Sequence, residues 1–242
     1  MSGLTFPTAQ KPLEVALAGG GIGGLAAALC LARVGHAVTV YEQADTFVES
    51  GAGVQISPNA SRVLHALGLT QSLREVGFLP EATEIRSWRS GRLISHTPLG
   101  NAAQQRYGAP YYHVHRGDLL QLLVVQAQAH PDIELVLGKR ISAFTEDSTG
   151  VLVDLGNESR TFDLLLGTDG IHSAVREQLW GERAADFTGN MAWRLLVPAN
   201  QLPEGLIAPN ATVWWGPGKH FVHYLVNGGR QVNCVCVVET DT

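Results

Sequence analysis

A glycine-rich segment between a strand-like run and a helix-like run constrains this chain more than any other feature. Residues 13–18, LEVALA, are apolar and suit a short strand, and residues 19–24 then read GGGIGG. The Ala- and Leu-rich residues 22–34 favour a helix that ends at Gly35. Residues 37–43, AVTVYEQ, have the β-branched side chains of a second strand. A right-handed crossover predicts that the two strands are parallel neighbours.

The glycines fit the GxGxxG pattern of dinucleotide-binding turns. Gly19, Gly21 and Gly24 take its three glycine positions, and Ile22 and Gly23 fill the gap before the last one. In this pattern the first glycine permits a tight turn and the second lets a pyrophosphate approach the backbone. The third lets the helix pack close to the strand. Free N–H groups at the helix start then face the phosphates.

A carboxylate follows at the spacing expected for a ribose-binding residue. Glu42 ends the second strand, 23 residues after Gly19, near the usual offset of ~20 residues, and Gln43 follows it. We therefore predict a dinucleotide site rather than a merely structural glycine turn. An acid at this position favours an unphosphorylated adenosine ribose, which indicates FAD or NAD rather than NADP. The spacing does not separate FAD from NAD.

Residues 166–176, LGTDGIHSAVR, place an aspartate between two glycines at the end of an apolar run. Two interpretations of Asp169 are open. It could cap a helix over 172–180, because aspartate favours helix caps and turns, or it could contact a bound ligand.

The rest of the chain divides into a mixed part and a strand-rich part. The mixed part is predicted to contain a Gly-rich loop whose second half is a helix (51–68), a hairpin turning at Ser90-Gly91 (82–97), a helix (116–130), a parallel-type strand from 133 and a hairpin around 148–150. Beyond Trp180, four strand-like runs follow without a helix, within 190–199, 211–217, 219–226 and 230–239. An α/β part followed by an antiparallel sheet predicts two domains.

Composition excludes several classes of protein. The 242 residues are 45% hydrophobic and 16% charged, as in ordinary folded domains. A net charge of -5 argues against nucleic acid or an anionic membrane as partner. We expect no signal peptide and no membrane span. Three scattered cysteines indicate a cytoplasmic protein, and Cys234 and Cys236 share one strand face, which favours core packing over a metal or redox pair.

Taken in order, the motifs resemble those of the flavoprotein aromatic hydroxylases, which are single-component FAD monooxygenases of the p-hydroxybenzoate and salicylate hydroxylase type. The matching segments are GGGIGGLAAALCLARVGHAVTVYEQ, GAGVQISPNASRVLHALGL, HRGDLLQLL, LLLGTDGIHSAVR, TGNMAWRLLVP and WWGPGKHFVHYLVNGGRQVNCVCVVE. The last two are most similar to the salicylate and 3-hydroxybenzoate hydroxylase branch. The resemblance covers nearly the whole chain.

The resemblance implies an α/β fold with two interleaved domains. A Rossmann-like FAD-binding domain that carries the GxGxxG turn is expected over 1–78 and 105–180. A mainly antiparallel β-sheet substrate domain, like that of p-hydroxybenzoate hydroxylase, is expected over 79–104 and 181–242.

The resemblance also implies FAD as the cofactor and assigns residues to it. Glu42 would bind the adenosine ribose, Arg116 would reach the flavin or pyrophosphate, and Asp169 would contact FAD near the pyrophosphate. Arg176 would help to hold the segment that also serves the nicotinamide cofactor. Simpler interpretations remain open, in which Asp169 caps a helix and Arg116 only flanks one. Arg62 is interpreted as part of a solvated helix face.

The reaction implied is hydroxylation of a phenolic or aromatic acid with NAD(P)H and dioxygen. His220 would help to deprotonate the phenol, since the ordinary pKa of histidine is near neutral. Arg194 would bind a carboxylate or lie beside the flavin. The alternatives are that His220 is only a polar residue on a half-exposed strand and that Arg194 is only a surface cation. The pairs His113/His115 and His220/His223 have no carboxylate at ligand spacing, so no metal site is expected.

One family motif is missing. Members of that family extend further than this sequence and contain a Gly-Asp pair followed by Ala-His-Pro. The Gly117-Asp118 pair of this sequence is not that motif, because it belongs to a predicted helix. We therefore expect a truncated chain that holds the adenosine end of FAD weakly and turns over poorly. Its last strand would leave an unpaired apolar edge of the sheet. Such an edge can associate with a second copy of the chain, so a homodimer is possible. A non-catalytic FAD- or nucleotide-binding fragment is an alternative. An NAD-dependent dehydrogenase is disfavoured, because the Asp169 segment and the antiparallel domain have no place in it.

Overall fold

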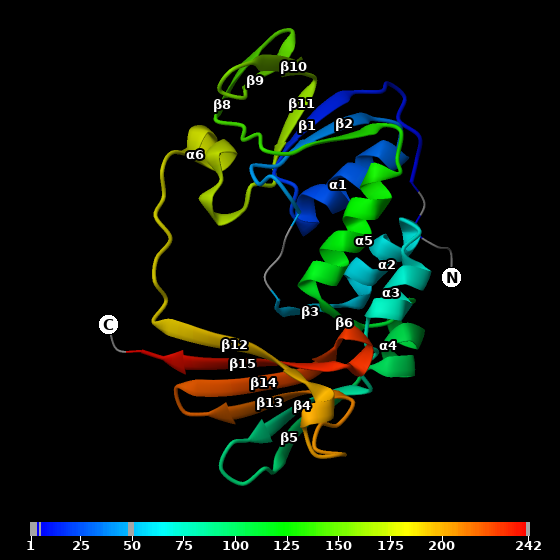
Figure 1. The fold of residues 1–242 in the computed structure, drawn as a ribbon, viewed down its shortest axis with the longest axis vertical. Coiled ribbons are helices and arrows are strands. Elements are labelled where there is room, and N and C mark those ends of the chain that lie inside the picture. Colours follow the sequence, from blue (N-terminus) through cyan, green and yellow to red (C-terminus); the bar gives the residue numbers. More distant parts are fainter. Residues whose placement is uncertain (1–3, 5, 48–50, 241–242) are drawn as a thin grey trace. The chain divides into compact units, whose positions relative to one another are not determined.

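The chain forms two compact units in a computed structural model that describes residues 4, 6–47 and 51–240 (Figure 1). The α/β unit falls within Thr5–Val48 and Leu120–Ala185. The sheet unit falls within Glu49–Leu119 and Asp186–Thr242, with Leu4. Helix α5 (Arg116–Gln128) begins in the sheet unit and continues into the α/β unit.

These units and the predicted domains divide the chain differently, and residues 181–185, predicted in the substrate domain, fall in the α/β unit. The sequence analysis assigned 49–78 and 105–119 to the FAD-binding domain, whereas these segments pack with the sheet unit. The domain boundaries themselves remain a prediction, because packing between segments does not say which of them bind the cofactor.

The α/β unit is built on a four-stranded parallel sheet in the order β11-β1-β2-β7. Its strands are β1 (Glu14–Ala18), β2 (Ala37–Tyr41), β7 (Ile133–Val136) and β11 (Leu164–Gly167). Helix α1 (Ile22–Arg33) connects β1 to β2, so the predicted β-α-β unit is confirmed. Its Ala28 and Ala32 pack on Val15 and Leu17, because side chains four apart share one helix face.

The opposite face of this sheet is covered by a second core. Alternation along β1 turns Ala16 and Ala18 to that face, where they join Tyr41, Val153 and Phe162. The covering elements include a three-stranded antiparallel sheet of β8 (Ala143–Asp147), β9 (Gly150–Asp154) and β10 (Ser159–Phe162), and helix α6 (Ala174–Trp180). The predicted hairpin around 148–150 is the β8–β9 pair. β10 was not predicted.

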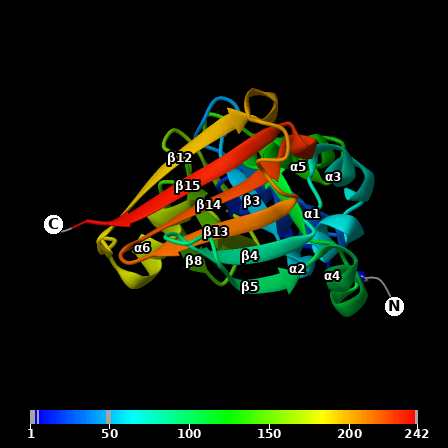
Figure 2. The same cartoon turned by 90° about the horizontal axis from the view of Figure 1, so that it is seen from below.

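The sheet unit contains a six-stranded sheet in the order β12-β15-β14-β13-β4-β5, seen in Figure 2. Its strands are β4 (Ala82–Ser87), β5 (Leu93–Pro98), β12 (Asn190–Pro198), β13 (Asn210–Gly216), β14 (Lys219–Val226) and β15 (Gln231–Glu239). Every neighbouring pair is antiparallel except β13 and β4, so the mainly antiparallel sheet is confirmed. The last strand, β15, is not the open edge that the sequence analysis expected, because it pairs with both β12 and β14.

Smaller elements complete the sheet unit. The sequence analysis predicted a loop before α2 (Pro58–Ala66), and this prediction is wrong for part of the segment. Residues Gly53–Ile56 form strand β3, which pairs with β6 (Tyr112–His115). Helices α3 (Thr70–Val76) and α4 (Gly100–Tyr107) were also not predicted. In the part of the chain that the structure describes, no helix is long and apolar enough to cross a membrane.

Candidate cofactor and substrate sites

The glycine turn that connects β1 to α1 has the geometry that its sequence predicts. Gly19 has φ +105°, and a Cβ placed there would lie 2.6 Å from the Thr168 carbonyl oxygen. A Cβ on Gly24 would lie 2.0 Å from the Gly19 carbonyl oxygen. Both positions therefore require glycine, the first for conformation and contact and the second for close packing of helix on strand.

The turn is open at Gly21 and Gly23, where the first helical amides emerge. Gly21 precedes α1 in an extended conformation, and Ile22 is the first helical residue. Added Cβ atoms at Gly21 and Gly23 would meet nothing within 4 Å. The first amides of a helix have no partner within it, and here no side chain caps them. Such an open, donor-rich turn fits the phosphates of a dinucleotide.

Glu42 is fixed beside this turn by two backbone amides. The Gly20 amide donates to its Oε2 at 2.8 Å, and the Ala44 amide donates to its Oε1 at 2.9 Å. Each carboxylate oxygen still has a second lone pair available. The carboxylate is therefore pre-positioned at the carboxyl end of β2, where a ribose hydroxyl pair could donate to it.

Asp169 accepts a hydrogen bond from the start of α6 with one oxygen and leaves the other without a partner in the described part of the chain. Its Oδ2 accepts from the Ala174 amide at 2.7 Å, at the start of α6. Its Oδ1 is buried without a hydrogen-bond partner in the described part of the chain. Ser173 also caps α6, by accepting from the Arg176 amide at 3.0 Å. Asp169 therefore serves the turn with one oxygen and has a second that is suited to a ligand's donor.

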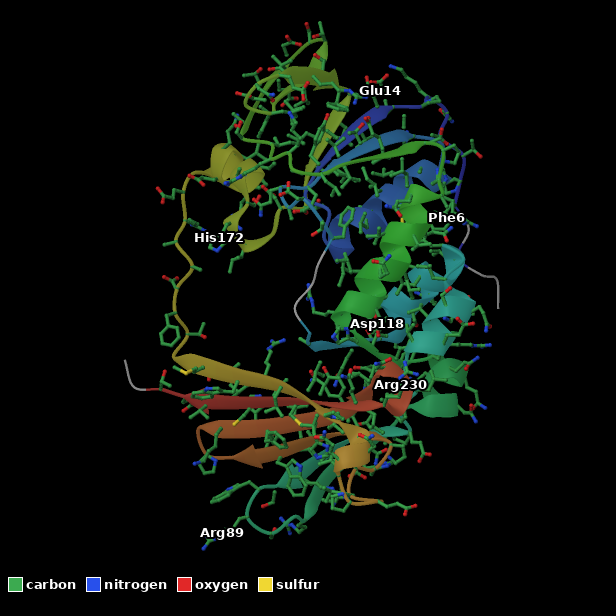
Figure 3. All side chains as sticks on the ribbon, in the orientation of Figure 1. Phe6, Glu14, Arg89, Asp118, His172 and Arg230 are labelled. Atoms are coloured by element: carbon green, nitrogen blue, oxygen red, sulfur yellow. The ribbon has the colours of Figure 1, made fainter. Side chains whose placement is uncertain are left out.

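Arg176 stabilises the same turn. Its guanidinium donates to the Ile171 carbonyl at 2.7 Å, which ties α6 back to the 3-10 turn Gly170–His172. His172, labelled in Figure 3, lies at the end of that turn. Its position just before α6 puts it next to the segment that Arg176 holds.

Five of the predicted cofactor residues line one cavity of about 530 Å³ in the α/β unit, whereas Ile22, Gly23, Gly24 and Arg176 do not line it. Gly19, Gly21, Glu42, Gln43 and Asp169 all contribute to it, so the structure brings together residues from three separate stretches of sequence. Its volume lies within the usual range for small-molecule sites. The donor-rich turn, the fixed Glu42 carboxylate and the partnerless Asp169 oxygen fit the adenosine and pyrophosphate portion of a dinucleotide.

Sequence reasoning missed Lys139, Arg140 and His172 in this cavity. Lys139 Nζ forms an ion pair with Glu158 Oε1 at 3.0 Å. Both cations follow the carboxyl end of β7, the edge where open parallel sheets bind ligands. Recognising β7 as a third parallel strand beside β2 could have drawn attention to them.

A second group of predicted residues lies on one face of the six-stranded sheet. His220 pairs with Val237, and Val222 pairs with Val235, which pairs in turn with Arg194. Because alternate residues of a strand share a face, His220 and Arg194 point from the same face, one strand apart across β15. His220 lines a cavity of about 450 Å³ with Trp88, Trp215 and Lys219 among others.

Tyr224 belongs to this face and was not predicted. It lies four residues after His220 on β14, and burial raises the pKa of its hydroxyl to about 12, an effect that the nearby Arg194 charge partly offsets. The phenol is therefore a neutral hydrogen-bond donor. The i, i+4 spacing on a strand could have identified it, since such residues share a face.

His113 and Cys234 are buried in the packed interior of the sheet unit. His113 is fully buried against Phe78 and Tyr224, and burial lowers its pKa to about 4. Among the described residues there is no group of three or more His, Cys, Asp or Glu side chains that could hold a metal. Cys234 is buried, and burial raises the pKa of its thiol, as expected of a packed cysteine.

Arg116 begins α5 in the sheet unit, where its amide donates to the Ala52 carbonyl at 2.9 Å. The cavity that contains Glu42 and Asp169 belongs to the other unit. The role of Arg116 toward the flavin or pyrophosphate stays a prediction.

The fold and the first cavity define a class of dinucleotide-binding protein, and comparison with known proteins identifies the dinucleotide. The model of the FAD binding domain family matches residues 12–231. The chain belongs to this family, which makes FAD the cofactor and decides the choice between FAD and NAD. The predicted Rossmann-like FAD-binding fold with its second, sheet-based domain is confirmed.

The relatives narrow the class further. The chain is 38% identical over 225 residues to 3-amino-4-hydroxybenzoate 2-monooxygenase of Streptomyces cremeus, covering 93% of this chain and 56% of the relative. It is 39% identical over 224 residues to 3-hydroxybenzoate 6-hydroxylase of Polaromonas naphthalenivorans, covering 92% and 56%. The chain thus spans a little over half the length of these relatives. The resemblance to aromatic-ring monooxygenases is confirmed.

A solved structure shows the same architecture. HpxO of Klebsiella pneumoniae, complexed with FAD and uric acid, superimposes with a TM-score of 0.81 at 27% identity, covering 95% of this chain and 57% of that one. Both the fold and the use of FAD are therefore shared with a protein crystallised with its flavin.

Proposed function

We propose that this chain provides the FAD site and the substrate sheet of a monooxygenase that hydroxylates a phenolic or aromatic acid with NAD(P)H and dioxygen. The observation that carries the proposal is the cavity of the α/β unit, which the glycine turn, Glu42 and Asp169 line together. The names of the relatives, which act on hydroxybenzoates, support the substrate class.

The proposed FAD contacts follow from the geometry of that cavity. Glu42 accepts from the adenosine ribose, while the amides that follow Gly21 bind the pyrophosphate. Asp169 accepts from a donor of the cofactor with its second oxygen, and Arg176 keeps the turn in place. Bound FAD supplies the redox chemistry by which dioxygen is activated, and the protein binds and orients the reactants.

The substrate roles are assigned to one face of the six-stranded sheet. We assign Arg194 to the substrate carboxylate, because arginine binds carboxylates in a bidentate manner. His220 accepts the phenol proton, which makes the ring more electron-rich at the carbon to be hydroxylated. Tyr224, held neutral by burial beside Arg194, donates a hydrogen bond to the same ligand.

The test uses FAD binding and substrate response in turn. The purified chain is expected to bind FAD and to show flavin absorption, and 3-hydroxybenzoate or salicylate is expected to perturb those bands. Arg194→Gln should abolish the perturbation and leave FAD binding unchanged. Absence of FAD binding would refute the proposal. FAD binding without any response to either acid would identify a non-catalytic FAD-binding chain instead.

We also propose a homodimer and a cytoplasmic location. Strand β12 is an edge of the sheet, and it exposes Met191, Trp193 and Leu195, of which Trp193 is 54% exposed. An apolar edge strand is a site of association. All three cysteines are unpaired, which agrees with a reducing compartment. Sedimentation measurements with Trp193→Lys would test the dimer, because a charge there should shift it to monomers.

A further inference from the structure

The largest of the described cavities in the sheet unit has no role in the function proposed above. It has a volume of about 870 Å³ and lies among α2, α4 and the end of β5. Its lining differs from that of the cavity that contains His220, and all of its residues belong to the sheet unit.

Two unpaired cations define its charge. Arg62 of α2 and Arg106 of α4 both line the cavity, and no Asp or Glu does so. Among the residues that the structure describes, Arg62 has no hydrogen-bond or ion-pair partner, and Arg106 contacts only the Tyr107 ring, at 5.4 Å. Within the described part of the chain, neither guanidinium is therefore neutralised by a carboxylate. They favour an anionic ligand.

The helix terminus at the cavity adds little to this charge. α2 begins there, but Pro58 has no N–H group, and the Ala60 and Ser61 amides already donate to the Ser57 carbonyl at 3.0 Å. Only the Asn59 amide remains at that end. The guanidinium groups, not the helix, therefore determine what the cavity attracts.

The walls are mainly apolar and include two phenol rings. Pro98, Leu99 and Ala103 line one part, and Tyr107 and Tyr111 another. Tyr111 is held in place because its hydroxyl donates to Gln55 Oε1 at 2.9 Å, and burial raises its pKa, so it stays neutral. Apolar walls with aromatic rings favour a flat, partly apolar molecule, since rings pack well on rings.

From this combination, we propose that the cavity is a second binding site, separate from the substrate face, for a small aromatic carboxylate. The carboxylate lies between Arg62 and Arg106, each of which donates charge-assisted hydrogen bonds. The ring lies against Tyr107, Tyr111 and Leu99. The site does not depend on the function proposed above, because it uses none of the residues assigned to FAD or to the reaction.

The test is calorimetric titration of the FAD-saturated chain with 2-naphthoate and, separately, with 2-naphthamide, which has the same shape without the charge. The double variant Arg62→Gln/Arg106→Gln should weaken 2-naphthoate binding roughly tenfold or more, because both charged contacts are removed. Both arginines are exposed, so the variant should fold. Arg89→Gln is the matched control, since Arg89 lies at the tip of the β4–β5 hairpin (Figure 3).

A steric variant tests the location independently. Ala102→Trp fills the cavity from its exposed rim without a change in charge, and it should also weaken 2-naphthoate binding. Arg194→Gln should leave this binding unchanged, which separates the site from the substrate face. The proposal is overturned if 2-naphthamide binds as tightly as 2-naphthoate, if the double variant binds normally, or if Arg194→Gln alone removes binding.

Discussion

Two adjacent glycines in the dinucleotide turn should respond in opposite ways to the same substitution. A Cβ on Gly24 would lie 2.0 Å from the Gly19 carbonyl oxygen and 2.9 Å from Thr168 Oγ1, whereas real Cβ contacts essentially never fall below 3.0 Å. A Cβ on Gly23 would meet nothing within 4 Å. Both residues lie in the first turn of α1, so the pair isolates the effect of packing.

The neighbours of Gly24 cannot easily move away. The Gly19 amide donates to the Tyr41 carbonyl at 2.8 Å, and the Thr168 hydroxyl contacts the carbonyls of Ala18 and Gly19 at 2.8 and 2.9 Å. Overpacking of this kind costs about 1–3 kcal/mol, and a strained or lost Thr168 hydrogen bond adds about 1 kcal/mol. The helix preference of alanine over glycine returns at most about 1 kcal/mol.

We therefore expect Gly24→Ala to lower the free energy of unfolding by about 1–3 kcal/mol. Gly23→Ala should leave it unchanged or raise it by up to about 1 kcal/mol. Urea unfolding of the FAD-free chain, followed by circular dichroism, measures both, with equal m-values as the check that the same surface unfolds. If Gly24→Ala is as stable as the unchanged chain, the close-packing account of this turn is wrong.

Three further outcomes follow from the same structure. Gly21→Ala should leave stability nearly unchanged, since its Cβ meets no protein atom, but should weaken FAD binding in a fluorescence titration; unchanged affinity would contradict the phosphate role. Glu42→Gln keeps an acceptor for one amide and loses the charge, so ADP should bind several-fold more weakly by calorimetry, and equal affinity would argue against a ribose contact. Burial depresses the pKa of His113 from 6.5 to about 4, so the unfolded chain binds more protons in that window. The contribution of His113 to the free energy of unfolding is therefore fully present above pH 6.5, and up to about 3 kcal/mol of it is lost toward pH 4. His113→Phe should remove this part of the acid sensitivity, which urea titrations at several pH values would measure.

The first β-α-β unit could be predicted because its signals are local. The apolar run before Gly19, the helix-forming residues 22–34 and the β-branched residues before Glu42 each specify an element on their own, and a short connection leaves one handedness. β3 was missed for the opposite reason. Its four residues form a strand through pairing with β6, about sixty positions later, and the preceding glycines suggest a loop.

The same difference between local signals and long-range strand pairing decides which candidate site residues could be predicted. Glu42 could be selected as a candidate because a ribose-binding acid is expected at a fixed distance from Gly19 in sequence. Lys139 and Arg140 join the same cavity only because β7 pairs with β2, a contact between residues about ninety-five positions apart. Tyr224 joins Arg194 on one face only through the register of three strands. Local sequence contains no signal for such pairings.

Asp169 shows why a local motif can be recognised without its role being decided. Capping a helix and binding a ligand both need a short acidic side chain in a turn, so the pattern around Gly170 predicts either. In the structure Oδ2 makes the cap to Ala174 and Oδ1 is left buried without a partner. A pure cap would tolerate asparagine, whose oxygen could accept from the same amide, whereas a buried acceptor for a ligand would not, because the amide nitrogen would stand where an acceptor is needed. Asp169→Asn should therefore preserve stability and lower FAD affinity, whereas preserved stability with unchanged FAD affinity would assign the residue to the cap alone.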